Sequence, residues 1–289
     1  MAEEIAGGNY SVRVDSRYGK IKSYEVWKLG ETLNHLAGNT EDYILQLKEE
    51  AEKKEAFLGN FTHEIKTPLT SIIGYSDLLR TYELTPDKRR EYGSFIYNEG
   101  KRLEQLALNL LQLIVMGKTE FERKETSTLE IFERLKEAVH FLGEKYHVKI
   151  AYQPEKSMVR VENSMILTAL INLVDNGCKA SGSGSRVLVK GEIKGEEYGF
   201  LVEDSGCGIP EEEIGRIMEP FYMVDKSRAR RQGGAGLGLA LCQKIAELHD
   251  GRIEIQSTMG EGTVVKLWIP VKETVEEDAQ EVEQEDEKT

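Results

Sequence analysis

The spacing of apolar residues changes once along the chain. From Glu41 to Gln112 these residues recur every three or four positions, the period of helices that bury one stripe. In the first helix, the a and d positions of one continuous heptad are Leu58, Phe61, Ile65, Pro68, Ile72, Tyr75, Leu79 and Tyr82, with Ile44, Leu47 and Ala51 leading into it in register. A second heptad follows the helix-start signal Thr85-Pro86-Asp87 and uses Tyr92, Ile96, Leu103, Leu106, Leu110 and Leu113. The pattern predicts two long helices joined by a short turn.

Two such helices form an antiparallel hairpin with apolar seams on both members. A lone hairpin has too little core to be stable, so we expect two copies to pair into a dimeric antiparallel four-helix bundle. Lys54 occupies a d position at the head of the first seam. Because a polar seam residue lets a coiled coil hold two nearly equal packings, our hypothesis is that a conformational signal passes through this segment.

Beyond about Gly117, short strands alternate with helices. A period of two, typical of half-buried strands, marks Val187, Val189 and Ile193, then Phe200 and Val202, then Ile253 and Ile255, then Val265, Leu267 and Ile269. Helical stretches lie between them near 128–146, 163–180 and 236–250. Helices that cover one face of a mixed sheet make an α/β sandwich, so the predicted fold is a helical bundle followed by an α/β sandwich domain.

Composition narrows the classes of function. The 289 residues are 39% hydrophobic and 31% charged, which indicates about two globular, helix-rich domains, and no run of eighteen apolar residues predicts a membrane span. The tail 273–289 holds nine acids and one lysine, so it carries −8 of the net charge of −13, is predicted to be disordered, and does not favour nucleic-acid binding. The cysteines lack metal-ligand spacing and are expected to form no disulfide, as in a reducing cytoplasm; they are Cys178, Cys207 and Cys242.

The segment Phe61–Leu69, F-T-H-E-I-K-T-P-L, carries the candidate chemistry of the bundle. His63 falls at heptad position f, opposite the seam, and we expect Glu64 and Thr67 to share its outward face. A His-Glu pair by itself is most often an exposed histidine beside a carboxylate, without a function. The nine residues together resemble the phosphoacceptor box of two-component sensor histidine kinases. The resemblance implies that His63 accepts a phosphoryl group, that Glu64 deprotonates its imidazole, and that Thr67 orients water when a phosphorylated partner is dephosphorylated.

Further motifs follow in the order of the same family. Asn172–Ala180 resembles its N box, and the spacing of Asn172, Asn176 and Lys179 places two amide oxygens and one ammonium on one helix face. Amide oxygens suit Mg²⁺. The resemblance implies that Asn176 binds the metal directly, with Asn172 beside it, and that Lys179 reaches the phosphates of ATP. Gly177 stands where the family prefers alanine, at a cost of up to about 1 kcal/mol in helix propensity.

Two motifs resemble the boxes that surround the base and open the lid. Asp204–Pro210 resembles the G1 box, in which Asp204 would accept a hydrogen bond from the exocyclic amine of adenine while Gly206 and Gly208 let the backbone approach the base. Glu219–Tyr222 resembles the F box, which contributes Phe221 and Tyr222 to the ATP site and begins a lid. The cations of that lid are Lys226, Arg228, Arg230 and Arg231, of which Arg228 is implied for the γ-phosphate.

A glycine-rich segment, Gly233–Leu239, opens directly into a predicted helix and resembles the G2 box. Its implied phosphate-binding residues are Gly234, Gly236, Leu237 and Gly238, because glycines expose backbone N–H groups at a helix N-terminus. A dinucleotide-binding fold would place such glycines after the first strand of a βαβ unit, which this position near the end of the domain does not match. Gly260–Thr263 resembles the closing turn of the family, where Thr263 is expected to hold adenine through water.

These resemblances divide the chain into five segments. Residues 1–40 resemble the connector and second helix of a HAMP signalling module, with an ordinary amphipathic N-terminal helix as the alternative. They are followed by a signalling coiled-coil helix (41–56), a dimerisation and histidine phosphotransfer domain (57–117), a catalytic ATP-binding domain (118–272) and the acidic tail (273–289). A HAMP remnant implies that the chain is the cytoplasmic portion of a receptor anchored in the cell membrane through an N-terminal segment.

The implied function is that of a sensor histidine kinase. With ATP and Mg²⁺ as cofactors, a homodimer would phosphorylate itself on His63 and pass the phosphoryl group to an aspartate of a response regulator. Residues matched by position to family docking sites for that regulator are Ser71, Gly74, Tyr75 and Leu78. Three alternatives stay open: a chain that acts mainly as a phosphatase of its partner, a non-catalytic nucleotide-sensing scaffold, and a conformational ATPase clamp with the same nucleotide fold.

Overall fold

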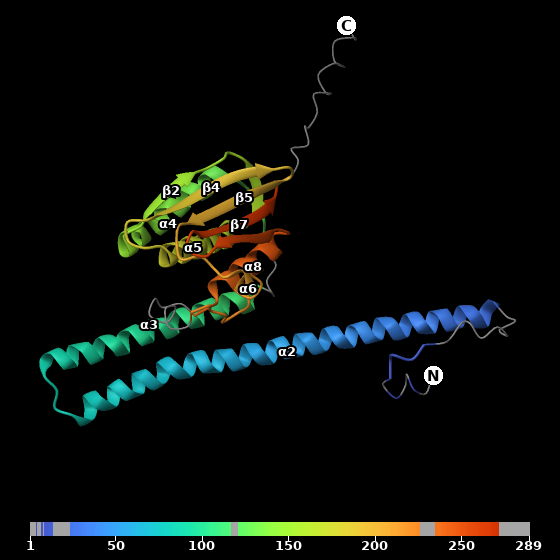
Figure 1. Cartoon of the computed structure of the whole chain (residues 1–289), viewed down its shortest axis with the longest axis horizontal. Helices are drawn as coiled ribbons and strands as arrows, with labels where there is room; N and C mark the ends of the chain where they lie inside the picture. The colour runs from blue at the N-terminus through green and yellow to red at the C-terminus, as the bar shows by residue number, and fades with distance from the viewer. Residues whose placement is uncertain are drawn as a thin grey trace, which may run out of the picture. The chain divides into compact units, whose positions relative to one another are not determined.

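A computed structural model of the chain describes residues 4, 7, 9–13, 24–116, 121–225 and 235–271 (Figure 1). The chain divides into two compact units, Met1–Glu64 and Ile65–Thr289, and helix α2 (Tyr24–Thr81) runs through the boundary. In the first unit, the Arg13 guanidinium forms an ion pair of 2.8 Å with Glu41 on α2. The helix continues without a break through residue 40, so the predicted boundary there is not marked by the backbone and stays a prediction.

The second unit begins with the predicted helical hairpin. Helix α3 (Pro86–Met116) starts with proline in its first turn, and the Thr85 hydroxyl accepts a hydrogen bond of 3.4 Å from the Lys88 N–H. The Tyr75 ring of α2 stacks on Phe95 of α3 at a centroid distance of 4.8 Å and lies 5.3 Å from Tyr92. These aromatic contacts fix the register between the two helices and confirm the hairpin.

Many apolar side chains of the hairpin are exposed in the single chain. Those of the second unit that are exposed are Leu69, Ile73, Tyr82, Phe95, Tyr97, Leu108, Leu111, Ile114 and Val115. Exposed apolar side chains that recur at helical spacing, as Leu69 and Ile73 or Leu108, Leu111 and Val115 do, are typical of a helix face that packs against a partner.

The remaining chain forms a five-stranded mixed sheet. Its strand order is β2 (Lys149–Gln153), β4 (Arg186–Lys194), β5 (Glu197–Asp204), β7 (Gly262–Pro270) and β6 (Arg252–Thr258). The β2–β4 pair is parallel and the other pairs are antiparallel. Four of these strands confirm the period-two prediction. Strand β2 and the small antiparallel sheet of β1 (Lys124–Ser127) and β3 (Met158–Val161) were not predicted, because these strands have only four or five residues and mixed polarity.

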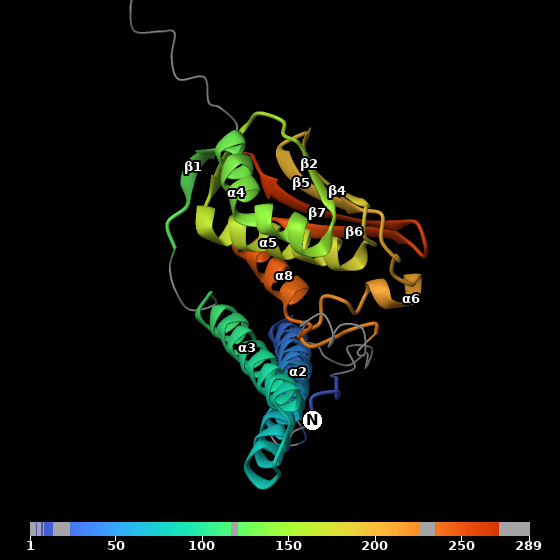
Figure 2. The same cartoon turned by 90° about the vertical axis from the view of Figure 1, so that its left-hand side faces the viewer.

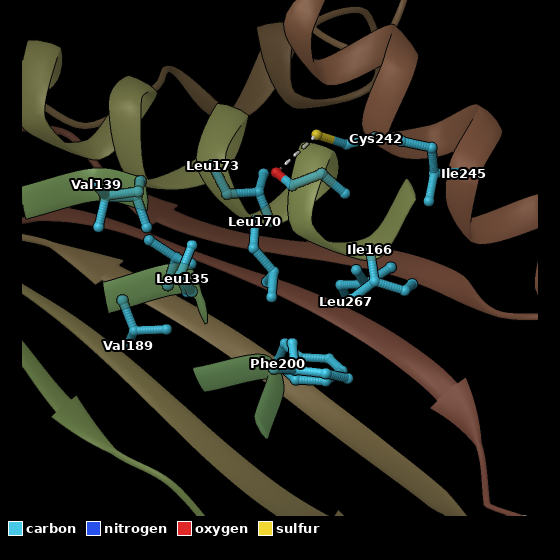
Figure 3. Packing of buried hydrophobic residues seen from close by; sticks show 14 of the residues in the cluster. Leu135, Val139, Ile166, Leu170, Leu173, Val189, Phe200, Cys242, Ile245 and Leu267 are labelled. Carbon is cyan, nitrogen blue, oxygen red and sulfur yellow. Dashed lines mark hydrogen bonds between the residues drawn. The ribbon is translucent and has the colours of Figure 1, made fainter. Parts of the chain in front are cut away.

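Three helices cover one face of the large sheet, as Figure 2 shows: α4 (Thr128–Tyr146), α5 (Asn163–Ala180) and α8 (Gly238–Leu248). They confirm the predicted helical stretches and the α/β sandwich. The short helix α6 (Glu211–Ile214) lies between β5 and α8 in the sequence. Figure 3 shows the core between helices and sheet, where the Cys242 thiol of α8 donates a hydrogen bond of 3.4 Å to the Ala169 carbonyl of α5.

One large side chain is buried on the opposite face of the sheet. Leu267 and Ile269 of β7 belong to the core under the helices, so Trp268 between them points away from the helices, yet it is only 1% exposed. Gly199, its partner on β5, leaves room for the indole, because a Cβ there would lie 2.7 Å from a ring carbon of Trp268. The cationic groups of Arg252 and Lys194 lie 5.5 and 5.8 Å from the ring centroid and cover it.

Candidate active site

The candidate phosphoacceptor is accessible on helix α2. The His63 side chain is 69% exposed, which confirms that the heptad places it away from the seam. Its Nδ1 lies 4.0 Å from Oε1 of Glu64, whose side chain is only 8% exposed. The expectation that Glu64 shares the outward face was wrong. Consecutive residues are turned by about 100° on a helix, so Glu64 falls at position g beside the seam although it directly follows His63.

The other bundle residues singled out in the sequence lie in the part of α2 that belongs to the second unit. Thr67, one turn after His63, and Ser71 are half-buried, and the Ser71 hydroxyl donates a hydrogen bond of 3.3 Å to the Thr67 carbonyl. Gly74 is exposed and Leu78 is half-buried, whereas the Tyr75 ring packs against α3. The accessible docking candidates are therefore Ser71, Gly74 and Leu78, and their role stays a prediction.

The candidate adenine acceptor, Asp204, stands at the end of β5 against the N-box helix. Its Oδ1 accepts a hydrogen bond of 2.8 Å from the Gly206 N–H, and its Cβ lies 3.4 Å from where a Cβ of Gly177 on α5 would be. Burial raises the pKa of the Asp204 carboxyl above its usual value, while hydrogen bonds from the backbone N–H groups of Gly206 and Thr263 act in the opposite direction. A carboxylate can accept about four hydrogen bonds, so Asp204 keeps acceptor capacity for a ligand amine beyond these two backbone donors.

Tight turns surround Asp204 on the side of β6 and β7. Gly262 has a φ of +133°, and a Cβ there would lie 2.0 Å from the Asp204 carbonyl; Gly208 has a φ of +69° and packs against the Thr258 carbonyl. Thr263 pairs with Asp204 across β5 and β7. Its hydroxyl lies 2.9 Å from that of Ser257, a residue that the sequence analysis missed. The Ser257 hydroxyl donates to the Gly262 carbonyl and accepts from the Ile209 N–H, at 2.9 and 2.8 Å, so it joins the closing turn to the G1 box.

An open groove of about 540 Å³ runs from Asp204 and Thr263 over β6 and β7 to α6. Its walls include three further carboxylates, those of Glu203, Glu211 and Glu261. A triphosphate would be repelled by this lining. The phosphate end of a nucleotide held by Asp204 would therefore lie in the other direction, toward α5 and α8.

The two asparagines of the N box meet the start of α8. A Cβ on Gly238, the first residue of α8, would lie 3.1 Å from Oδ1 of Asn172 and 3.7 Å from Nδ2 of Asn176. Asn172 is oriented by its own side-chain N–H, which donates 2.8 Å to the Thr168 carbonyl. The missing Cβ leaves a polar cradle beside a helix N-terminus, with amide oxygens that suit Mg²⁺. In the ranges that the structure describes, no cluster of three His, Cys, Asp or Glu side chains competes as a metal site.

Lys179 is held by a residue one turn earlier. Its ammonium lies 2.6 Å from the Asp175 carboxylate, and the Lys179 side chain is 20% exposed. The i, i+4 spacing of this pair is readable in the sequence, but Asp175 was not singled out there. A role of Lys179 at the phosphates stays a prediction and requires its ammonium to move away from Asp175.

The F and G2 boxes are joined at the base of the lid. Phe221 is 5% exposed with a φ of +68°, and its N–H donates a hydrogen bond of 2.8 Å to the carbonyl of Gly236, which also has a φ of +68°. Leu237 is buried, and the Tyr222 ring lies 4.3 Å below the Arg216 guanidinium with its hydroxyl bonded to Glu213. Some predicted residues of the lid and G2 box lie outside the described residues, namely Lys226, Arg228, Arg230, Arg231, Gly233 and Gly234.

Two family models match the chain on both sides of residue 120. The model described as His Kinase A (phospho-acceptor) domain matches residues 53–114, which include His63. The model described as histidine kinase-, DNA gyrase B-, and HSP90-like ATPase matches residues 161–273, which include every box of the candidate nucleotide site. The segment 1–40 lies outside both matches, so its HAMP resemblance stays a prediction.

Curated relatives match most of this chain with part of their own length. The chain is 32% identical over 289 residues to the circadian input-output histidine kinase CikA of Synechococcus elongatus, covering 96% of this chain and 37% of that protein. It is 28% identical to the sensor histidine kinase YclK of Bacillus subtilis and 29% identical to the signal transduction histidine-protein kinase ArlS of Staphylococcus aureus, covering 93% and 82% of this chain and 57% and 53% of theirs. The chain thus spans between a third and three fifths of the length of these relatives.

Solved structures share the fold. Histidine kinase ThkA, solved in complex with response regulator protein TrrA, superposes with a TM-score of 0.62 at 24% identity and covers 78% of this chain and 66% of that chain. Acinetobacter baumannii histidine kinase AdeS gives a TM-score of 0.58 at 19% identity over 73% of this chain and 98% of that chain. These structures share the long helical hairpin followed by a mixed α/β domain. Among the residues described here, none of the helices combines the length and apolarity needed to cross a lipid bilayer.

Proposed function

Since the chain belongs to the sensor histidine kinases, with a phosphoacceptor domain and an ATP-binding catalytic domain, we propose that it transfers the γ-phosphoryl group of ATP to His63. The observation that carries the proposal is the arrangement of the His63–Glu64 pair. The imidazole is 69% exposed, and its Nδ1 lies toward a carboxylate that is 8% exposed. The second ring nitrogen, Nε2, is then the nucleophile.

His63 and Glu64 together account for the bond that forms and for the proton that is released in the transfer step. Nε2 of His63 forms a bond to the γ-phosphorus while the bond from that phosphorus to the β,γ-bridging oxygen breaks, and ADP leaves with the electron pair. The Nδ1 proton passes to Glu64, which has only to close the present 4.0 Å to hydrogen-bonding distance. Most of the rate enhancement in such a reaction comes from positioning and charge neutralisation.

The catalytic domain supports the binding of ATP with Mg²⁺. Asp204 offers an acceptor to the adenine amine, and the Gly238 end of α8 offers N–H groups to the phosphates. The amide oxygens of Asn172 and Asn176 beside Gly238 fit the metal, which when bound neutralises charge on the phosphates. Gly206 brings the backbone against the Asp204 carboxylate, and Gly208 and Gly236 supply the positive φ values of +69° and +68° in the G1 and G2 boxes.

The exposed apolar surface of the hairpin supports a homodimer. It includes Leu108, Leu111 and Ile114 on α3 together with Leu69 and Ile73 on α2. Pairing two hairpins into a four-helix bundle removes these side chains from water at about 25 cal/mol per Å² of apolar area.

We further propose that the phosphoryl group passes from His63 to an aspartate of a response-regulator receiver domain. That domain would contact α2 at Ser71, Gly74 and Leu78, which follow His63 along the helix. Thr67 would orient the water that later removes the phosphoryl group from the regulator. ThkA was solved in complex with a response regulator, which supports a partner of this class. Replacing Thr67 by alanine should impair dephosphorylation of the partner and spare autophosphorylation; equal loss of both would refute this role.

The test is labelling with γ-³²P-ATP and Mg²⁺. The parent chain and a His35→Gln control, which removes another exposed histidine of α2, should acquire acid-labile, alkali-stable label, and His63→Gln should acquire none. Glu64→Gln should label at least about 100-fold more slowly, the size of a lost general base. Equal labelling of His63→Gln would refute the assignment. If the parent binds ATP but acquires no label, the chain is a nucleotide-sensing scaffold or mainly a phosphatase of its partner. If ATP hydrolysis is unchanged in His63→Gln, the result would favour the ATPase clamp.

A further inference from the structure

A buried histidine lies at the end of α8 that is remote from the nucleotide cradle. His249 is 1% exposed, its Nδ1 lies 2.7 Å from the Ile245 carbonyl, and its Nε2 lies 3.0 Å from the backbone N–H of Glu162. A carbonyl can only accept and an N–H can only donate, so Nδ1 carries the proton and Nε2 is an acceptor. These two contacts require the neutral imidazole.

The first contact joins His249 to its own helix, and the second joins it to the other nucleotide-binding helix. Ile245 belongs to the buried core of α8 (Figure 3). Glu162 is the N-cap of α5, where its carboxylate accepts hydrogen bonds from the Ser164 and Met165 N–H groups at 3.3 and 2.7 Å. The ring therefore fixes the start of the helix that carries the N box to the end of the helix that begins at the G2 box.

The same histidine meets the segment that follows bundle helix α3. The Phe121 ring lies 5.4 Å from the imidazole, and the Arg123 guanidinium lies 5.6 Å from the Phe121 ring centroid. Arg123 also donates 2.7 Å to the Leu248 carbonyl at the end of α8 and pairs with Asp250 at 2.5 Å. The last residue of α3, Met116, is buried in the core that α5 and α8 share. Residues 121–123 and both nucleotide helices are thus tied together at one point.

We propose that His249 is a positioning residue for phosphotransfer: its neutral imidazole locks the segment 121–123 to α5 and α8, so that the catalytic domain is held rigidly to the end of α3, and protonation of the ring releases this joint. The proposal rests on the proposed function, since His249 has a role in phosphotransfer only if the chain phosphorylates His63.

The charges around the ring determine the direction of its pH response. Burial, aided by the Arg123 cation, lowers the pKa of His249 below its ordinary value of 6.5, although the Ile245 carbonyl and the Glu162 and Asp250 carboxylates favour the cation. A protonated ring would also present a second N–H to the Glu162 N–H. The folded state therefore prefers the neutral ring, so the joint is complete at pH 6.5 and above and is lost only as the pH falls through the lowered pKa of the folded state. Burial alone would raise the pKa of Glu162, but hydrogen bonds from Ser164 and Met165 hold it below its usual value, so the α5 cap survives to pH 5.

Hydrogen–deuterium exchange of the full chain tests the joint, with exchange corrected for the intrinsic effect of pH. In His249→Phe, which keeps the ring volume and removes the acceptor, peptides covering 121–127 and 162–168 should exchange about tenfold faster or more, because a buried donor loses its partner. In His249→Gln, an amide oxygen can accept from the Glu162 N–H, so protection should be restored and should no longer change as the pH is lowered from 8, unlike that of the parent. His140→Phe, at an exposed position of α4, is the matched control and should behave as the parent.

Kinetics then connect the joint to phosphotransfer. At pH 8, His249→Phe should lower the rate of His63 phosphorylation at saturating ATP with little change in the KM for ATP, and His249→Gln should restore it. Unchanged exchange at 121–127 in His249→Phe, or a parent-like pH dependence in His249→Gln, would overturn the proposal. If the parent fails to label on His63, the proposed function fails, while the exchange experiment still decides whether the joint exists.

Discussion

Gly177 interrupts the N-box helix at a position where the structure accommodates a methyl group. A Cβ built there would lie 3.4 Å from Cβ of Asp204 and 3.5 Å from both methyl groups of Val187, distances of ordinary van der Waals contact. Replacing glycine by alanine inside a helix contributes up to about 1 kcal/mol. Burying the added methyl contributes up to about 0.8 kcal/mol more, so we expect Gly177→Ala to stabilise the catalytic domain by about 1 to 1.5 kcal/mol.

Calorimetry of the full chain measures this effect. For a domain of about 150 residues, the expected gain corresponds to a rise in Tm of about 2–6 °C, seen in the transition that Mg²⁺ and ATP also shift. The affinity for ATP should change by less than about threefold, because the Gly206 N–H still orients the Asp204 carboxylate. Gly206→Ala is the contrasting variant, since its Cβ would lie 2.6 Å from Oδ1 of Asp204, and it should lower the Tm. A lower Tm for Gly177→Ala would refute the reasoning, because it would mean that the site beneath Asp204 cannot take a methyl group.

Three further outcomes follow from contacts in the catalytic domain. Asp204→Asn can keep the bond to the Gly206 N–H but turns an N–H toward the adenine amine, so titration calorimetry should show ATP affinity reduced about 10- to 100-fold; unchanged affinity would remove Asp204 from the base site. Gly262→Ala combines a φ of +133° with a Cβ 2.0 Å from the Asp204 carbonyl, so it should lower the free energy of unfolding, measured in urea, by more than about 1 kcal/mol. Gly260→Ala, with a φ of +82° and open space around the Cβ, should lower it less. The reverse order would contradict the close approach at Gly262. Burial raises the pKa of the Cys178 and Cys242 thiols to about 11 and about 12, so iodoacetamide at pH 8 should modify the native chain only at the exposed Cys207. Mg²⁺ with ATP should slow this modification. A second adduct in the mass spectrum would argue against the packing of α5 and α8.

The sequence was sufficient for elements with strong periodicity. The helical stretches predicted near 128–146 and 163–180 coincide with α4 and α5, because each buries a complete apolar stripe against the sheet. The nucleotide boxes were recognisable for a related reason. Their glycines answer local needs, such as the positive φ of Gly208 and Gly236, which a sequence motif preserves.

The features that the sequence did not reveal depend on distant partners. The strand β1 has only the residues K-E-T-S and is defined by pairing with β3, more than thirty positions away. The roles of Ser257 and His249 depend on Ile209 and Glu162, which lie in other parts of the chain. Periodicity carries no information about such contacts.

The buried indole of Trp268 makes the catalytic domain spectroscopically visible. The chain has only two tryptophans, and the other, Trp27, is 40% exposed on α2. In a Trp27→Phe chain, emission would come from one ring that is shielded from water in the native state and wetted when β7 detaches. A red shift in that emission would then follow unfolding of the ATP-binding sheet alone, with the helical bundle optically silent.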